Sequence, residues 1–192
     1  MSRIPAHTMS GVLPPYSGAD PTRRAAMAPY RATLAEVIGR FGTTAPRMAI
    51  LQGLLKYRAA LRSAGFNSGF QWLAGSFVEE VERHQNRAPR DVDVVTFVTR
   101  PEGYTASDWG NFVTSRSNLL DPNECKRVYS CDAYLVDMTV PPEYLVNQTK
   151  YWFGLFSHQR TTLLWKGTIQ VDLMDDAEDG AAILADGGNH AP

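Results

Sequence analysis

Apolar positions along the chain recur at helical and at strand spacings, and the two spacings alternate. Thr33 and Glu36 form a capping box, in which each side chain bonds the other's free backbone amide, so they predict a helix that stops at Gly42. Apolar residues at helical spacing follow Pro46 and predict a second, longer helix that stops near Gly65.

The rest of the chain alternates in the same way. The β-branched residues over 91–98 predict a strand. The other predicted elements are an apolar stretch over 70–74, a polar helical segment over 77–84, a helix over 106–119 ended by Asp121-Pro122, a strand over 128–138, a helix over 143–156 and a strand over 168–173. This alternation predicts an α/β (α+β) domain, with a small mixed β-sheet flanked by helices.

The length and composition favour one domain with appendages. The chain has 192 residues, of which 44% are hydrophobic, and that is enough for a sizeable core. Residues 1–32 are rich in Pro, Gly and small side chains, and we expect an extended N-terminal arm there. Residues 33–174 would form the domain, and the acidic, Gly/Ala-rich residues 175–192 a disordered tail.

Charge is distributed unevenly along the chain. Residues 1–174 carry a net +4 and the last 18 residues carry −5, although the whole chain sums to −1. A mildly basic body suits a polyanionic ligand such as a nucleotide or RNA. No apolar run has the length of a membrane-spanning helix, and the N-terminus lacks the apolar core of a signal peptide, so we expect a cytoplasmic protein with no membrane partner.

Two short motifs carry the candidate chemistry. Gly75-Ser76 stands between an apolar stretch and a helical segment, where glycine permits a sharp turn and close approach to a ligand. The serine hydroxyl and the free amides of the helix start would then face one spot, which favours phosphate. Asp91 and Asp93 are two apart on a predicted strand, so both project from one face, about 7 Å apart along it.

Together these motifs predict a particular kind of metal site. Two carboxylates on one face repel each other unless a cation lies between them, and a hard divalent ion, Mg²⁺ or Mn²⁺, takes such oxygen ligands. A phosphate cradle beside paired carboxylates is typical of metal-assisted nucleotidyl transfer, in which the metal holds a nucleoside triphosphate and activates the attacking hydroxyl. Such sites usually need a third carboxylate from a neighbouring strand.

The same motifs give the chain a resemblance to known proteins. A Gly-Ser, a spacer and an apolar-flanked Asp-x-Asp form the signature of the nucleotidyltransferase fold of the DNA polymerase beta superfamily. More closely, the chain resembles a bacterial family of nucleotidyltransferase-like proteins with an N-terminal Gly-x-Leu-Pro-Pro motif. The matching segments are Gly11–Pro15, Arg40–Gly42, Arg47, Trp72–Phe77, Pro89–Val95, Asp132-x-Tyr134, Trp152, Arg160 and Lys166-Gly167. The resemblance covers most of residues 11–173 and implies the nucleotidyltransferase fold and its class of chemistry, without a substrate.

Three residues in strand-like contexts are candidates for the third carboxylate: Asp132, Asp137 and Asp172. Asp132 is preferred, because it lies on the strand after Asp93, where the superfamily usually places this group, and because it matches the family's Asp-x-Tyr. Strand parity puts Asp132 and Asp137 on opposite faces, so at most one of them points inward without a bulge. Asp172 has the cleanest apolar flanks and stays an alternative.

Two basic residues complete the predicted site. Arg160 and Lys166 follow an apolar helix, and either would contact a triphosphate, Arg by its fork and Lys as a point charge. A solvated loop explains them equally well. Gly75, Ser76, Arg160 and Lys166 are therefore the predicted nucleotide-binding residues, and Asp91, Asp93 and Asp132 the predicted metal-binding and catalytic residues.

These observations predict an enzyme that transfers a nucleoside monophosphate from ATP or another nucleoside triphosphate to an acceptor hydroxyl. The acceptor stays open among RNA, including tRNA, a protein and a nucleotide, and the basic excess favours RNA. By analogy with the superfamily, a role in a toxin–antitoxin or antiphage system, with a cognate partner protein, is a further expectation. The main alternative is a degenerate nucleotidyltransferase domain that only binds, as an antitoxin, sensor or scaffold, and a metal-binding phosphohydrolase is a third interpretation.

Overall fold

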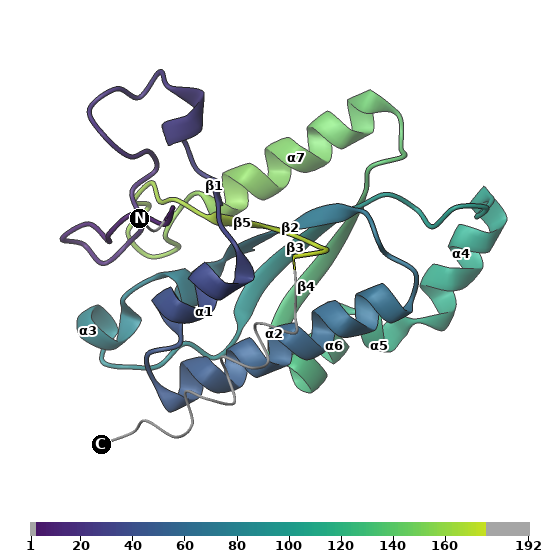
Figure 1. The fold of residues 1–192 in the computed structure, drawn as a ribbon, viewed down its shortest axis with the longest axis horizontal. Helices are drawn as coiled ribbons and strands as arrows, with labels where there is room; N and C mark the ends of the chain where they lie inside the picture. Colours follow the sequence, from purple (N-terminus) through teal and green to yellow (C-terminus); the bar gives the residue numbers. More distant parts are fainter. Residues whose placement is uncertain (1–2, 176–192) are drawn as a thin grey trace.

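The computed structural model describes residues 3–175, and a five-stranded mixed sheet lies at its centre (Figure 1). Its strands are β1 (Tyr30–Arg31), β2 (Gly69–Ala74), β3 (Val92–Val98), β4 (Cys131–Asp137) and β5 (Ile169–Asp172). They lie in the order β1-β5-β2-β3-β4, with β2 antiparallel to both neighbours and with β3–β4 and β1–β5 parallel. The expected α/β class with a mixed sheet and flanking helices is confirmed.

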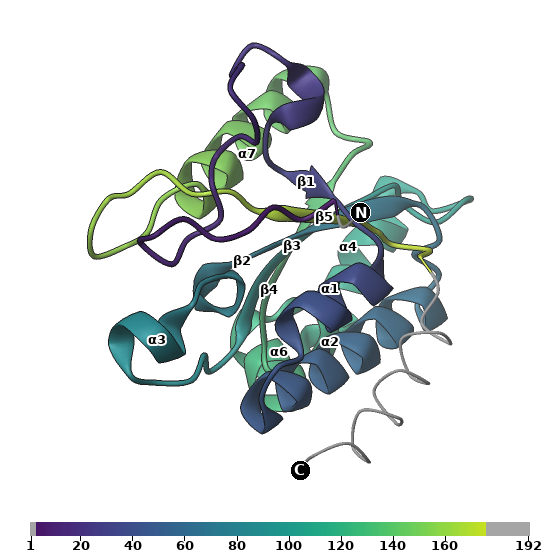
Figure 2. The same cartoon turned by 60° about the vertical axis from the view of Figure 1, so that its left-hand side comes forward.

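Helices cover both faces of this sheet. They are η1 (Arg24–Ala26), α1 (Leu34–Phe41), α2 (Ala45–Ser63), η2 (Gly75–Val78), α3 (Val81–Gln85), α4 (Ala106–Ser115), α5 (Ser117–Leu120), α6 (Pro122–Tyr129) and α7 (Pro142–Phe156). Helix α7 lies on one face, and α1, α2 and α6 lie on the other (Figures 1 and 2). Among the helices of residues 3–175, none has both the length and the apolar character needed to cross a membrane.

The central strand β3 is buried on both faces, which explains its apolar sequence. Val92 and Val94 pack in a cluster with residues of α1 and α2, whereas Val95 and Phe97 pack with Trp152 of α7 on the opposite face. Successive side chains of a strand point to opposite faces, so Asp93, between Val92 and Val94, lies on the same face as Val95 and Phe97. Burying such a strand is favourable by about 25 cal/mol for each Å² of apolar surface removed from water.

The N-terminal segment packs on the domain and contributes a strand. Val12 and Leu13 are buried, and the carbonyl of Leu13 accepts a 2.8 Å hydrogen bond from the amide of Gly167. Strand β1 then pairs with β5 at the edge of the sheet. The tail expected over 175–192 lies outside the described residues except for Asp175, whose carboxylate accepts a hydrogen bond from the backbone of Leu34.

The predicted starts and stops of the first two helices, α1 and α2, hold, whereas a predicted strand start later in the chain fails. The capping box of Thr33 and Glu36 is present at α1. The strand expected from residue 128 begins only at Cys131, because α6 occupies the preceding residues. The carboxylate of Asp121 accepts hydrogen bonds from two amides of the first turn of α6, and Pro122 stands where a helix tolerates proline, so the dipeptide starts a helix as well as ending one.

Candidate active site

A cleft of about 540 Å³ opens at the end of the sheet where β3 and β4 begin. All seven predicted site residues line it. They are Gly75 and Ser76 after β2, Asp91 just before β3, Asp93 in β3, Asp132 in β4, and Arg160 and Lys166 between α7 and β5. The end of α7 and the loop that joins it to β5 line the cleft as well. Figure 2 shows α3 and this loop at the same end of the sheet.

Gly75 lies against the carboxylate of Asp93. The antiparallel register pairs Ala74, the last residue of β2, with Asp93, and the chain turns at the next residue. Gly75 has φ +74°, and a Cβ on it would lie 2.0 Å from Oδ2 of Asp93. Both the left-handed backbone and the close approach therefore require glycine here.

Ser76 continues the turn as part of η2, a four-residue 3-10 helix. The serine was expected to begin a longer helix, but α3 starts only at Val81, after a break at Glu79 and Glu80. A single 3-10 turn has a much smaller dipole than a long α-helix. Any phosphate at this turn would therefore depend on individual backbone amides and the serine hydroxyl more than on a helix dipole.

Three carboxylates meet in the cleft. The parallel register pairs Asp93 of β3 with Asp132 of β4, on the face that α7 covers, and Asp91 stands just before β3. The pKa of Asp93 is raised to about 6, first by burial and then by the negative charges of Asp91 and Asp132. The elevated pKa is thus consistent with the register and the shared cleft, which place the three carboxylates near each other in a poorly solvated part of the molecule.

The other two candidates for the third carboxylate lie elsewhere. Asp137, at the far end of β4, pairs with Arg100 and accepts hydrogen bonds from Thr139. Asp172 lies opposite Phe70 in the β2–β5 ladder, and its carboxylate accepts a 2.8 Å hydrogen bond from the amide of Met174. Of the three candidates, the structure brings Asp132 to Asp91 and Asp93.

Tyr134 gives the Asp-x-Tyr pattern a structural reason. It lies two residues after Asp132, on the same face of β4, and its ring packs 4.5 Å from that of Trp152 between centroids. Burial raises the pKa of Tyr134, and the charge of Asp132 and a hydrogen bond to it raise that pKa further. The tyrosine side chain thus lies near the Asp132 carboxylate in the cleft.

Lys126 is a site residue that the sequence analysis missed. Its ammonium Nζ lies 2.7 Å from Oδ2 of Asp91 and 3.7 Å from Oδ2 of Asp132. The hydrogen bond to Asp91 and the nearby negative charges raise the pKa of Lys126. The residue belongs to α6, which was not predicted, and the pair Asp121-Pro122 was the signal that could have found that helix.

Lys166 lines the cleft but is buried and already paired with a carboxylate. It is 4% exposed, and its ammonium bonds to the carboxylate of Glu79 and lies 3.3 Å from the carbonyl oxygen of Gly75. Gln159 donates a 2.8 Å hydrogen bond to the other oxygen of Glu79. Glu79 therefore compensates the charge of Lys166, and Lys166 contacts the backbone of the Gly75 turn. Nothing in the sequence indicated the role of Glu79.

Two arginines stand at the rim of the cleft. Arg160 is exposed, and within residues 3–175 its guanidinium makes no ion pair. Arg87 is also exposed and donates hydrogen bonds to Gln85 and to its own loop. Both guanidinium groups are thus available to an anionic ligand in the cleft.

The donor chemistry of the three carboxylates fits a hard divalent cation, because all the available ligands are oxygens. Their spacing is looser than that of a formed metal site: among residues 3–175, no three His, Cys, Asp or Glu side chains are grouped closely enough to hold an ion. Lys126 supplies the positive charge against Asp91 and Asp132. The residues that would hold a divalent cation here are the three aspartates.

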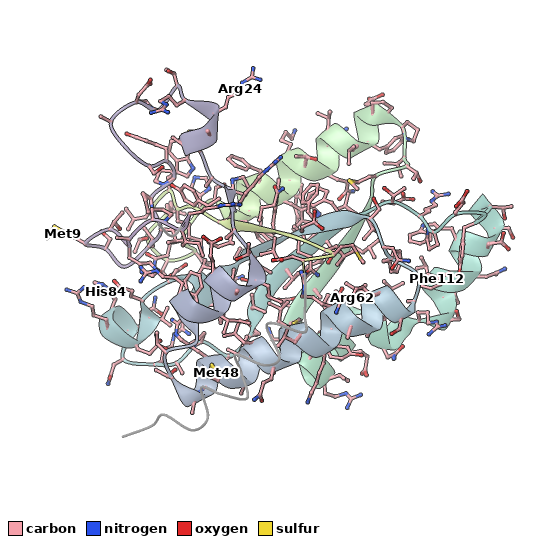
Figure 3. The ribbon with its side chains drawn as sticks, viewed as in Figure 1. Met9, Arg24, Met48, Arg62, His84 and Phe112 are labelled. Atoms are coloured by element: carbon pink, nitrogen blue, oxygen red, sulfur yellow. The ribbon has the colours of Figure 1, made fainter. Side chains whose placement is uncertain are left out.

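A second cavity, of about 590 Å³, lies over α4 and contains none of the predicted residues. It is lined by Tyr104, Phe112 and Arg116 among others, and its Asp108 is engaged in the capping box of α4. Figure 3 shows Phe112 at the opposite end of the molecule from His84 of α3. The first cleft is therefore the candidate site.

Comparison with known proteins gives one result. A family profile described as "Family of unknown function (DUF6932)" matches residues 5–172, so the chain belongs to this family. No curated protein and no solved structure matches the chain. The description of the family states no activity and no fold.

Proposed function

We propose that this member of the DUF6932 family is a metal-dependent nucleotidyltransferase, which transfers a nucleoside monophosphate from a nucleoside triphosphate to an acceptor hydroxyl. One observation carries the proposal. The Gly75 turn and the carboxylates of Asp91, Asp93 and Asp132 line a single cleft, although they come from three different strands. Glycine at position 75 lets the turn pass directly beside the Asp93 carboxylate, so a triphosphate held at the turn would lie next to a cation held by the carboxylates.

Each group has a role in this chemistry. Asp91, Asp93 and Asp132 would hold Mg²⁺ or Mn²⁺, and the bound cation would neutralise the triphosphate and lower the pKa of the acceptor hydroxyl. The turn at Gly75 and Ser76 would hold phosphate oxygens through backbone amides and the serine hydroxyl. The guanidinium of Arg160 would bind the outer phosphates from the rim of the cleft.

The reaction follows from this arrangement. The acceptor oxygen attacks the α-phosphorus, the bond from that phosphorus to the bridging oxygen breaks, and pyrophosphate leaves. Asp132, with Tyr134 beside it, would face the entering hydroxyl and accept its proton directly or through water. The carboxylates are held on strands, so little reorganisation is needed when charge develops.

The acceptor is proposed only as a class. RNA, including tRNA, is favoured by the basic excess of residues 1–174 and by the exposed arginines at the rim, and a protein side chain or a nucleotide are the other candidates. A cytoplasmic role in a toxin–antitoxin or antiphage system is a prediction from the resemblance alone.

A second candidate function is a binding protein without catalysis, such as an antitoxin, a sensor or a scaffold. Two observations favour it: the carboxylates do not form a closed metal site, and Lys126 occupies the space against Asp91. In that case the cleft would bind nucleotide without transferring it.

Label transfer separates the two functions. The protein is incubated with α-labelled ATP, GTP, CTP or UTP, with Mg²⁺ or Mn²⁺, and with bacterial RNA and protein extract. Wild type is compared with Asp91→Asn/Asp93→Asn, and with Asp172→Asn as a control carboxylate outside the cleft. We expect label in one acceptor class with wild type and Asp172→Asn only. Nucleotide binding without label in any fraction would support the binding protein, and equal labelling by the double variant would overturn the proposal.

A further inference from the structure

We propose that Lys126 is a further nucleotide-binding residue of the cleft: a divalent cation displaces its ammonium from Asp91, and the ammonium then contacts the triphosphate. This inference rests on the proposed function and adds to it a residue, a ligand group and an order of events. The Lys126 side chain lines the cleft, and its ammonium lies beside the carboxylates of Asp91 and Asp132.

The backbone of Lys126 is held rigidly beside the cleft. The carboxylate of Asp121 caps the start of α6, and the amide of Ser130 bonds to the carbonyl of Lys126 at its end. Helix α6 also touches α2 through backbone, since a Cβ on Gly53 would lie 1.9 Å from the carbonyl oxygen of Tyr129. Cys125, next to Lys126, is fully buried. The attachment point of the side chain therefore does not move away from the cleft.

The side chain itself is free to change partners. Lys126 is 50% exposed, whereas its partners Asp91 and Asp132 are 16% and 28% exposed. A lysine has a flexible four-carbon stem and a compact charge that needs no fixed geometry. The ammonium can thus leave Asp91 and stay in the cleft, which Lys126 lines together with Ser76 and Arg87.

Charge decides which partner the ammonium takes. The ammonium of Lys126 pairs with these carboxylates, and that of Lys166 also acts on Asp93 but is already paired with Glu79, so the three carboxylates are short of positive charge. A divalent cation on these carboxylates supplies two charges where the ammonium supplied one, and it repels the ammonium. A triphosphate that arrives with the metal offers new anionic oxygens within the same cleft, and the released ammonium binds them.

The contrasting interpretation is an ordinary surface ion pair. Such pairs contribute little, and their removal changes neither metal nor nucleotide affinity specifically. Our proposal instead requires two changes of opposite sign. Loss of the Lys126 charge tightens metal binding in the absence of nucleotide, because a competitor is gone, and weakens nucleotide binding in the presence of metal, because a contact is gone.

The test uses the full chain and four proteins: wild type, Lys126→Gln, Lys126→Arg and Arg127→Gln. Arg127 is the matched control, because it lies beside Lys126 on α6, is 69% exposed and pairs with Glu124 instead of the cleft. Circular dichroism checks that each variant folds. Mn²⁺ affinity is measured by electron paramagnetic resonance, and the affinity for α,β-methylene ATP and GTP by calorimetry at saturating Mg²⁺.

For Lys126→Gln we expect Mn²⁺ binding about fivefold tighter and nucleotide binding about fivefold to tenfold weaker. Lys126→Arg should keep nucleotide affinity near that of wild type, and Arg127→Gln should match wild type in both measurements. Affinities of Lys126→Gln that equal those of wild type, or a tighter metal site with unchanged nucleotide affinity, would overturn the inference alone. A wild-type protein that binds neither Mn²⁺ nor nucleotide would overturn the proposed function and this inference with it.

Discussion

Lys166 with Glu79, and Lys126 with Asp91, both pair an ammonium with a carboxylate in the same cleft, but at very different depths. The side chains of the first pair are 4% and 6% exposed, whereas those of the second are 50% and 16% exposed. A buried pair is costly to separate, because either charge alone is stranded away from water, and an exposed pair exchanges partners easily. The two pairs thus differ in role because they differ in burial. The buried Lys166–Glu79 pair contacts the Gly75 turn, and the more exposed Lys126–Asp91 pair is accessible to a ligand that enters the cleft.

The largest effect is expected from breaking the buried pair. Lys166→Met leaves the Glu79 carboxylate buried without its cation, and the free energy of unfolding should fall by about 3–5 kcal/mol. Replacing both residues, as Lys166→Met/Glu79→Met, should recover most of this loss. Urea unfolding of the three proteins checks it. A single variant as stable as wild type would show that the depth of the pair has no energetic consequence.

A smaller, pH-dependent effect is expected at Asp93. Its folded-state pKa of about 6 is above the ordinary 3.8, so the folded protein prefers the protonated form. This contribution is full below about pH 4 and is lost as the pH rises through 6, so wild type should lose about 2–3 kcal/mol over that window from this group. Asp93→Asn should therefore be more stable than wild type at pH 7.5 and equal to it near pH 4.

Unfolding by urea at both pH values, without added metal, measures this difference. Asp172→Asn is the control, because its carboxylate lies outside the cleft. A gain for Asp93→Asn that is the same at both pH values would contradict the assignment of the effect to a crowded carboxylate.

The next largest loss of stability is expected from a substitution in the turn at Gly75. Gly75→Ala must adopt φ +74° and also place its methyl group on the Asp93 carboxylate, so we expect a loss of about 1–2 kcal/mol from the backbone plus a further loss from the contact. Gly18→Ala separates the two costs, because Gly18 has φ +81° with no atom within 4 Å of the added Cβ. Equal losses in thermal unfolding would mean that the contact with Asp93 is not tight.

The smallest effect on stability is expected from the exposed pair. Lys126→Gln should change the free energy of unfolding by less than about 1 kcal/mol, and the change should shrink in high salt. Urea unfolding at low and high salt checks this. A loss comparable to that of Lys166→Met would remove the distinction between the two pairs.

Much of the fold could be predicted because its signals are local. The capping box of Thr33 and Glu36 and the apolar run of β3 each specify their element from adjacent residues. Helix α6 was missed because Val128 and Tyr129 have strand propensity, whereas the packing of α6 against α2 and β4 makes them helical. Strand β1 has two residues and exists because β5 offers an edge, which no local pattern reveals.

Some residues of the candidate site could likewise be predicted from local sequence patterns, and others could not. Gly75, Asp91 and Asp93 stood out because turn glycines and alternating carboxylates are local patterns. Lys126 and Glu79 did not, since their roles come from pairing across the fold; Glu79 and Lys166 are 87 residues apart in the sequence. The burial of Lys166 and its pairing with Glu79 could not be predicted either, because a basic residue in a loop pattern carries no sign of its burial.

The central claim is that Asp91, Asp93 and Asp132 hold a divalent cation beside a triphosphate that rests on the Gly75 turn. A crystal structure with Mn²⁺ and α,β-methylene ATP or GTP, with anomalous data for manganese, tests it most directly. The account predicts an anomalous peak among the three carboxylates, phosphates at Gly75 and Ser76, and the Lys126 ammonium away from Asp91. Manganese or nucleotide bound only elsewhere, or a cleft with Lys126 still on Asp91 at saturating ligand, would contradict it.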